Sequence, residues 1–193
     1  MMPWPTATLE SLYADPSRNG LTRPKRTRGQ GYPIIYMGKI FAHERIGNIA
    51  TDRVPMSDRE IDLFAVRAGD LLFARQSLVA AGAGKCALVR CTAETTTLES
   101  HFIRVRLDQR KADPEFFHDY FLSPLGKANV PSLVMQVAAA GIRGSELATL
   151  HVPVPPLSTQ RRIADILSAY DDLGEGRSRA GNGRLAQWRR PRA

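Results

Sequence analysis

The sequence has little of what builds disulfide frameworks, membrane spans or metal centres. It contains two cysteines among 193 residues, Cys86 and Cys91, and no second Cys or His pair is spaced to complete a zinc site. Their spacing favours two reduced structural thiols in a cytoplasmic protein. No stretch approaches the roughly 20 apolar residues that a membrane-spanning helix needs, and prolines interrupt the N-terminal segment where a signal peptide would be apolar. We therefore expect no membrane association and no bound metal.

Catalytic signatures are missing as well. Many nucleases carry an acidic residue two positions before a lysine, but here those positions hold Arg23, Met37, Ala83, Gln109 and Leu125. The four histidines are scattered, and none adjoins a Ser or Cys in a recognisable nucleophile turn. The segment 82–85 (GAGK) resembles the end of a phosphate-binding loop, but the first glycine and the final hydroxyl of that motif are absent and a strand is predicted to follow. The sequence therefore argues against an enzyme.

What the chain does have is enough apolar residues for one core and two concentrated basic segments. Its composition is 43% hydrophobic and its net charge is +8. Residues 18–45 hold seven basic residues and one acidic residue, and residues 174–193 hold six arginines and one glutamate, so the remainder of the chain is slightly acidic. Two basic segments on such a body favour a polyanionic partner. Solvated surface charge is the alternative interpretation.

Strand signals occur through the first two thirds of the chain. Turn residues and apolar runs predict buried strands at Leu71–Ala74 and Cys86–Arg90. Tyr32–Phe41 alternates enough to predict a pair of strands with a turn near Gly38. In Phe102–Leu107, apolar residues alternate with two arginines, which predicts one buried face and one polar face turned to nucleic acid or to water.

Helix signals complete the prediction of the fold. Asp113–Pro114 predicts the start of a helix with an aromatic core face, and Ser57 with Glu60 predicts a short capped helix. Together the elements predict an α+β domain, a twisted and largely antiparallel sheet with helices set against it.

Two groups of hydrogen-bond donors are candidates for contact with nucleic acid. The first lies in a loop rich in glycine, proline and charge, where basic side chains can follow a phosphate backbone. The second flanks a loop of small residues and a turn between two glycines, from which donors can reach phosphates or base edges. The first group is Arg23, Lys25, Arg26 and Arg28; the second is Arg75, Gln76, Ser77, Lys85 and Arg143.

The stretch Val152–Leu173 predicts that the globular body gives way to a helix. Three prolines forbid a helix at its start, and Ser158 or Thr159 can cap the helix that follows. One face of this helix carries an apolar stripe at i, i+3, i+4 and i+7, formed by Ile163, Ile166, Leu167 and Tyr170. Such a stripe requires a partner.

This stretch, VPVPPLSTQRRIADIL followed by an Asp pair, resembles the junction between a target recognition domain and the conserved spacer helix in specificity subunits of type I restriction-modification systems. The resemblance extends back through GIRGSELATL, DPEFFHDYFLS and GDLLFARQSLVAAGAGKCALV and begins near Trp4. The order and spacing of these pieces make it specific. At Thr159 the family usually carries a glutamate, so one capping contact is weakened.

The resemblance implies the α+β architecture and a role in choosing a DNA sequence. It implies that double-stranded DNA is bound by this chain, and that the chemistry belongs to partners: a modification (methyltransferase) subunit and a restriction subunit. S-adenosylmethionine, ATP and magnesium are expected on those partners and no cofactor on this chain. The apolar stripe is expected to bind partner subunits or a second specificity half-subunit.

The chain departs from the family after Leu173, where a spacer helix should continue. Residues 174–193 instead combine glycine with arginine, a composition that breaks helices. We expect a recognition domain over residues 1–157, the start of the spacer helix over 158–173 and a disordered basic tail, as in a truncated or frameshifted product; a functional tail is the alternative. Two further interpretations stay open: a recognition segment of a larger restriction or methylation enzyme, and a remnant that binds partner subunits alone.

Overall fold

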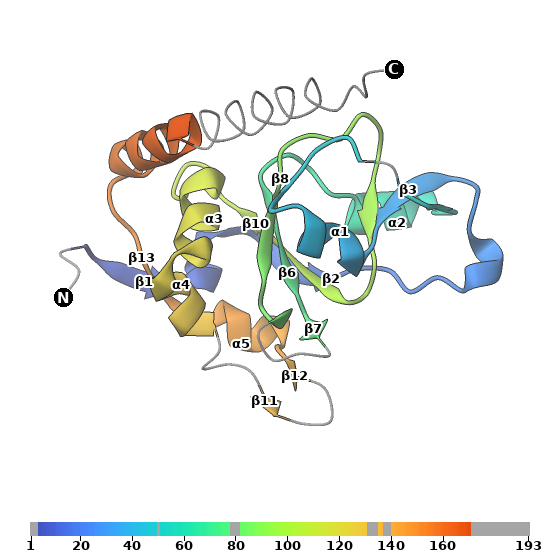
Figure 1. Ribbon diagram of the computed structural model, residues 1–193, viewed down its shortest axis with the longest axis horizontal. Helices are drawn as coiled ribbons and strands as arrows, with labels where there is room; N and C mark the ends of the chain where they lie inside the picture. The colour runs from blue at the N-terminus through green and yellow to red at the C-terminus, as the bar shows by residue number, and fades with distance from the viewer. Residues whose placement is uncertain (1–3, 50, 78–81, 131–134, 137–139, 171–193) are drawn as a thin grey trace, which may run out of the picture.

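A central sheet of five strands organises the molecule (Figure 1). The computed structural model describes residues 4–49, 51–77, 82–130, 135–136 and 140–170. The strand order is β2–β10–β6–β8–β4, and neighbours are antiparallel except for the parallel pair of β4 and β8. These strands are β2 (Tyr13–Asn19), β4 (Arg45–Ile46), β6 (Asp70–Ala74), β8 (Cys86–Val89) and β10 (Phe102–Leu107).

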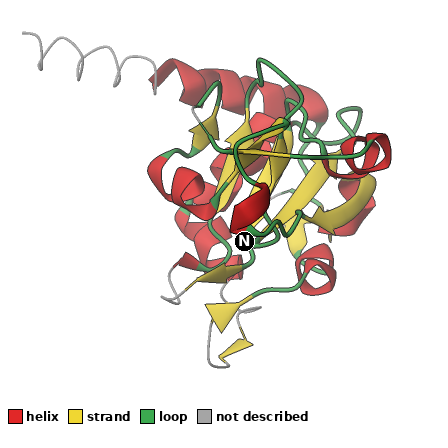
Figure 2. Cartoon of the chain, turned by 90° about the vertical axis from the view of Figure 1, so that its right-hand side faces the viewer, coloured by secondary structure: helices red, strands yellow, loops and turns green. Residues whose placement is uncertain are grey.

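Three smaller sheets surround the central one, in the orders β5–β3–β9, β11–β12–β7 and β1–β13. Their strands are β1 (Thr6–Thr8), β3 (Tyr32–Ile35), β5 (Arg53–Val54), β7 (Gln76–Ser77), β9 (Thr97–Leu98), β11 (Met135–Gln136), β12 (Ala140–Gly141) and β13 (His151–Pro153). Most pairings are antiparallel, and the helices lie around the strands in Figure 2. The predicted α+β fold with a largely antiparallel sheet is confirmed.

The helices are short. They are η1 (Leu9–Leu12), η2 (Lys25–Thr27), α1 (Met37–Ala42), α2 (Asp58–Phe64), α3 (Pro114–Leu122), α4 (Pro124–Asn129), α5 (Gly144–Ala148) and a C-terminal helix whose described part covers residues 157–170. Among the described helices, none is long and apolar enough to cross a membrane.

The central sheet is buried on both faces because helices cover each side. Along β6, Leu71 and Phe73 join one cluster of buried side chains, whereas Leu72 between them joins another, as the two-residue period of a strand requires. Phe117 of α3 belongs to the first cluster and Ile40 of α1 to the second. In Figure 1, α3 and α1 accordingly lie on opposite sides of the strands.

The strand β10 corrects one prediction. It is paired on both edges, and the face that carries Arg104 is covered by α2 and the residues after it. Arg104 is buried and donates from Nη1 to the carbonyl oxygens of Leu63 (3.2 Å) and Ala65 (3.0 Å). Arg106 is bound by the carboxylates of Asp70 and Asp15. The prediction that these arginines face nucleic acid or water is therefore wrong.

Capping signals predicted the starts of α2 and α3 accurately. The Asp113 carboxylate accepts a hydrogen bond from the Phe116 backbone N–H at 3.0 Å, and α3 begins at Pro114. The aromatic face of α3 packs into the core, with Phe121 edge-on to Phe73 at 4.9 Å between ring centroids. The capping box of α2 is present too, since the Ser57 backbone N–H donates to Glu60 at 3.0 Å.

The segment Tyr32–Phe41 is half strand and half helix. Its first residues form β3, but the predicted second strand is wrong because Met37–Ala42 forms α1. The Met37 N–H donates to the Glu99 carboxylate, and Ile40 turns into the core. The carboxylate that binds the first turn of this helix lies 62 positions away along the chain, so no local pattern could reveal the contact.

The chain enters and leaves the body at one place. β1 pairs antiparallel with β13, with Thr6 opposite Pro153 and Thr8 opposite His151. The C-terminal helix then begins at residue 157, and the Pro156 carbonyl accepts hydrogen bonds from the backbone N–H groups of residues 159 and 160. The predicted caps at Ser158 and Thr159 are therefore wrong, because both residues lie inside the helix. The predicted tail lies outside the described residues.

Candidate nucleic-acid interface

A basic loop between β2 and β3 projects at one end of the molecule, at the right of Figure 1 where the chain is blue. Its tip is the turn η2. The Thr27 backbone N–H and hydroxyl both donate to the Pro24 carbonyl, at 3.0 and 2.8 Å, and the Arg28 N–H donates to the Lys25 carbonyl at 3.2 Å. Lys25 and Arg26 are exposed on this turn. The structure thus gives the loop a defined local shape.

Arg23 lies at the start of the loop and is engaged within the protein. Its Nη2 contacts the Glu60 carboxylate at 2.5 Å, and its side chain is 18% exposed. The Ser57 backbone N–H, and after it the Arg23 guanidinium, hold the pKa of the Glu60 carboxyl below its usual value. Arg23 therefore ties the loop to the first turn of α2.

Arg28 lies at the other side of η2 and is also engaged. Its guanidinium carbon lies 4.6 Å from the centroid of the Tyr36 ring, and its Nη1 lies 3.7 Å from the Asp52 carboxylate. The next residue, Gly29, donates from its backbone N–H to the Arg53 carbonyl at 2.9 Å. The Arg53 Nε in turn donates to the Gly31 carbonyl at 2.7 Å. The loop is held at both ends.

The second group of candidate residues meets where β7 pairs with β12. Gln76 lies opposite Gly141, Ser77 lies opposite Ala140, and the Arg75 carbonyl accepts from the Ile142 N–H at 2.9 Å. Arg143 follows at the start of α5 and is exposed, and its N–H donates to the Glu146 carboxylate at 2.8 Å. The structure therefore brings Arg75, Gln76 and Ser77 beside Arg143, although they are far apart in the sequence.

Lys85 joins this group through the backbone of β6 and the start of β8. The Ala74 N–H donates to the Lys85 carbonyl at 2.8 Å, next to Arg75. The Lys85 Nζ lies 5.7 Å from the centroid of the exposed Phe41 ring and 3.4 Å from the Phe41 carbonyl oxygen. The preceding glycine loop leads into a strand, as predicted, and so lacks the helix of a phosphate-binding loop.

The two groups occupy different regions of the surface. In Figure 1 the basic loop lies at the right-hand end, while β7, β12 and α5 lie at the lower edge. The sheet β11–β12–β7 projects at the lower edge of Figure 2 as well. A nucleic acid that met both groups would have to extend across the surface between them.

A third surface lies on the C-terminal helix, which crosses above α3 in Figure 1. Of the predicted apolar stripe, Ile163 packs against the body, whereas Ile166, Leu167 and Tyr170 are 50%, 41% and 70% exposed. Docking on the body instead uses Ala164 and the fully buried Gln160, which the sequence analysis missed. Three apolar side chains thus remain exposed on one helix.

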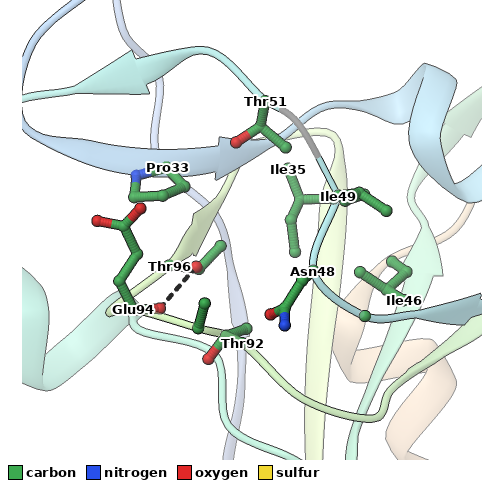
Figure 3. A pocket seen from close by; sticks show the side chains of 11 residues that line it. Pro33, Ile35, Ile46, Asn48, Ile49, Thr51, Thr92, Glu94 and Thr96 are labelled. Atoms are coloured by element: carbon green, nitrogen blue, oxygen red, sulfur yellow. Dashed lines mark hydrogen bonds between the residues drawn. The ribbon is translucent and has the colours of Figure 1, made fainter.

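A pocket of about 230 Å³ lies beside β3 (Figure 3). Pro33 and Ile35 line it from β3 and Ile46 from the end of β4, and residues 47–49, 51, 92–94 and 96 line it from two loops. Glu94 is the one ionisable side chain among the described lining residues, and Arg53 binds its carboxylate at 2.5 and 2.8 Å. This Arg53 hydrogen bond lowers the pKa of Glu94. The pocket therefore offers no acid–base pair for catalysis.

In the part of the chain that the structure describes, neither the cysteines nor potential metal ligands form a further site. Cys86 is buried in β8, where burial raises the pKa of its thiol well above the usual value, and Cys91 is exposed and unpaired. Within the described ranges, no group of three His, Cys, Asp or Glu side chains is placed to hold a metal ion.

Comparison with protein families gives a match that covers most of the chain. Residues 18–179 match the model of the "Type I restriction modification DNA specificity domain". The specificity subunit of the type I restriction enzyme EcoKI from Escherichia coli K12 is 28% identical over 175 residues, which are 86% of this chain and 36% of that protein. The putative MjaX specificity subunit from Methanocaldococcus jannaschii is 26% identical over 181 residues, covering 88% of this chain and 40% of that protein.

Solved structures show the same fold. One of these structures comes from work on the complex assembly and conformational transition of the type I R-M system. A chain in it superposes on this protein with a TM-score of 0.69 at 18% sequence identity. The superposition covers 97% of this chain and 43% of that one. The chain thus spans about two fifths of the length of the curated relatives and of this structure.

Proposed function

The chain belongs to the type I restriction modification DNA specificity domain family, and on that premise we propose that it binds double-stranded DNA and selects the target site for partner subunits. The observation that carries the proposal is the extent of the match. Residues 18–179 include β4, β6, β8 and β10 of the central sheet, both groups of candidate DNA-binding residues and the described C-terminal helix. The matched relatives carry the name specificity subunit, which supports a role in target recognition.

DNA contact is proposed at the two groups of donors. The basic loop would neutralise phosphates through the exposed side chains of Lys25 and Arg26, for which no partner is found among the described residues, and this contribution does not depend on sequence. The donors gathered around β7 and β12 would reach base edges, because they lie on a projecting edge of the molecule. These residues are Arg75, Gln76, Ser77, Lys85 and Arg143.

The exposed face of the C-terminal helix is proposed to pair with the corresponding helix of a second recognition module. Ile166, Leu167 and Tyr170 leave apolar surface in water, which a second amphipathic helix would cover. The matched relatives are more than twice as long as the matched region, so they have room for a second module of this size. In this chain the second module would be another copy.

The chemistry is proposed to lie on the partners. A methyltransferase subunit would bind S-adenosylmethionine, a restriction subunit would use ATP and magnesium, and this chain would need no cofactor. The alternative of a remnant that binds partner subunits alone makes a different prediction for DNA, which the following experiment separates.

The test is the salt dependence of DNA binding. Duplex DNA affinity of the intact chain, measured by fluorescence anisotropy between 50 and 200 mM salt, should fall linearly on a log–log plot with a slope of about −0.9 for each phosphate neutralised. In the double variant Lys25→Gln/Arg26→Gln, the magnitude of the slope should decrease by about 1.8. A slope near zero for the unmodified chain would exclude DNA recognition and favour the remnant.

A further inference from the structure

The four basic side chains of the loop differ in what already binds them. Lys25 and Arg26 are exposed, and neither side chain has a hydrogen bond or ion pair with another described residue. Arg23 and Arg28 are both held from within. We propose that Arg23, Arg28 and Glu60 are positioning residues that fix the shape of η2, and that the phosphate contacts of this loop come from Lys25 and Arg26. The inference rests on the proposed function, because it assumes that the loop meets DNA.

Arg23 has little capacity left for a phosphate. Each of its three guanidinium nitrogens donates within the protein: Nη2 to Glu60 at 2.5 Å, Nε to the Pro55 carbonyl at 3.2 Å and Nη1 to the Thr22 carbonyl at 3.2 Å. Three of the five N–H groups of the planar guanidinium are therefore directed at protein acceptors. The Glu60 carboxylate already pairs with the Arg23 charge, so a phosphate would compete with Glu60 for this guanidinium.

Glu60 makes this anchor stiff. Its other carboxylate oxygen accepts from the Ser57 backbone N–H at 3.0 Å and from the Ser57 hydroxyl at 3.2 Å. The carboxylate is thus fixed at the start of α2 before Arg23 binds it. The start of the loop is therefore held next to the N-terminus of α2.

Arg28 anchors the other side of the turn by a different interaction. Its guanidinium covers the Tyr36 ring at 4.6 Å and lies 3.7 Å from Asp52. Behind it, Gly31 has a φ of +92°, and a Cβ there would overlap the Val54 carbonyl, so the chain passes close against β5. With both flanks fixed, Lys25 and Arg26 lose less conformational freedom when they bind.

Glu60→Gln gives a test in which two explanations predict opposite signs. The substitution removes a negative charge near the loop, so electrostatics alone predicts tighter binding of DNA. The anchoring contact predicts weaker binding, by about three- to tenfold, because the turn is no longer preorganised. Asp62→Asn is the matched control, since it removes the same charge from an exposed position on α2. It should leave the affinity unchanged or raise it.

Limited proteolysis measures directly whether the turn η2 becomes more mobile in Glu60→Gln. Trypsin cleaves after lysine and arginine, so cutting within residues 25–28 should be faster in Glu60→Gln than in the unmodified chain or Asp62→Asn. Urea midpoints for all three proteins show whether the effect is confined to the loop.

The salt slope distinguishes the two pairs of cations. Arg23→Gln, Lys25→Gln, Arg26→Gln and Arg28→Gln each remove one positive charge. Lys25→Gln and Arg26→Gln should each reduce the magnitude of the slope by about 0.9. Arg23→Gln and Arg28→Gln should weaken binding with the slope retained.

Two results would overturn the inference while leaving DNA binding intact: a slope reduced equally by all four substitutions, or tighter binding by Glu60→Gln. Failure of the proposed function would look different, because the unmodified chain would then show no salt-dependent binding at all.

Discussion

Arg106 of β10 and Asp70 of β6 form a bidentate ion pair in the central sheet. The guanidinium Nε and Nη2 lie 2.8 Å from the two Asp70 oxygens, and Asp70 is 1% exposed. Asp70 also accepts the Arg67 N–H at 2.7 Å, and Arg106 reaches Asp15 at 3.0 Å. Because the Asp70 carboxylate is shielded from water, solvent cannot replace the Arg106 guanidinium as its partner.

Asp70→Ala should therefore destabilise the protein by about 3–5 kcal/mol, since it leaves a largely buried guanidinium with a single carboxylate. Urea denaturation followed by circular dichroism measures this. Arg110→Ala is the control, because Arg110 pairs with Asp108 on the surface with a side chain that is 90% exposed. It should barely move the midpoint. Equal effects of the two substitutions would show that burial does not strengthen the Asp70 pair.

The same residues mark a limit of sequence analysis. Alternation along Phe102–Leu107 correctly predicted a strand, since the period of a strand is a local property. It could not predict that α2 covers the polar face, because the carbonyls that bind Arg104 come from residues about 40 positions earlier. For the same reason Arg23 and Arg28 were indistinguishable from Lys25 and Arg26.

At the scale of elements, one glutamine fixes the direction of the C-terminal helix. Gln160 is fully buried, and its Oε1 accepts from the Asp113 N–H at 2.8 Å. Its Nε2 donates to the Pro155 carbonyl at 2.8 Å and to the Lys111 carbonyl at 3.2 Å. The amide thus joins the first turn of this helix to the residues that precede α3.

Gln160→Ala should cost about 2–3 kcal/mol, because one buried and two partly buried backbone groups lose their partner. Gln160→Glu keeps an acceptor for Asp113 but loses the donor, and should also destabilise. Hydrogen exchange of the Asp113 amide should increase in the alanine variant and can be followed by NMR. An unchanged exchange rate would show that Gln160 does not hold this junction.

Elements with local signals were the predictable ones. The caps at Ser57 and Asp113 define the starts of α2 and α3 because the acceptor lies within three residues of the donor. α1 was missed because the stabilising carboxylate, Glu99, is distant in sequence. The docking of Gln160 was missed for the same reason.

At the scale of the molecule, the described surfaces divide between a body with two donor groups and a helix with an apolar face. The family match shows that the chain belongs to the type I restriction modification DNA specificity domain family, and the sequence predicted both the donor groups and the apolar stripe. It did not show that the basic loop and the β7–β12 edge lie in separate regions, because their arrangement depends on the packing of the whole sheet. Which of these residues touch DNA stays a prediction.

Replacing Ile166, Leu167 and Tyr170 by serine should weaken self-association of the chain by about two orders of magnitude, since each apolar side chain removed from an interface costs about 1 kcal/mol or more. Sedimentation velocity over a range of concentrations measures this. Arg161→Ser/Arg162→Ser is the control on exposed polar positions of the same helix. If the unmodified chain sediments as a monomer throughout, the helix does not pair with a second copy.

The pairing of β1 with β13 places Thr6 and Pro153 side by side, so the whole recognition body is inserted between two neighbouring points of the chain. A body whose two ends lie side by side can be exchanged as one unit. Under the proposed function, another body whose ends are equally close could replace it without redirecting the helix that follows, and a new target preference would then arise by exchange rather than by gradual substitution.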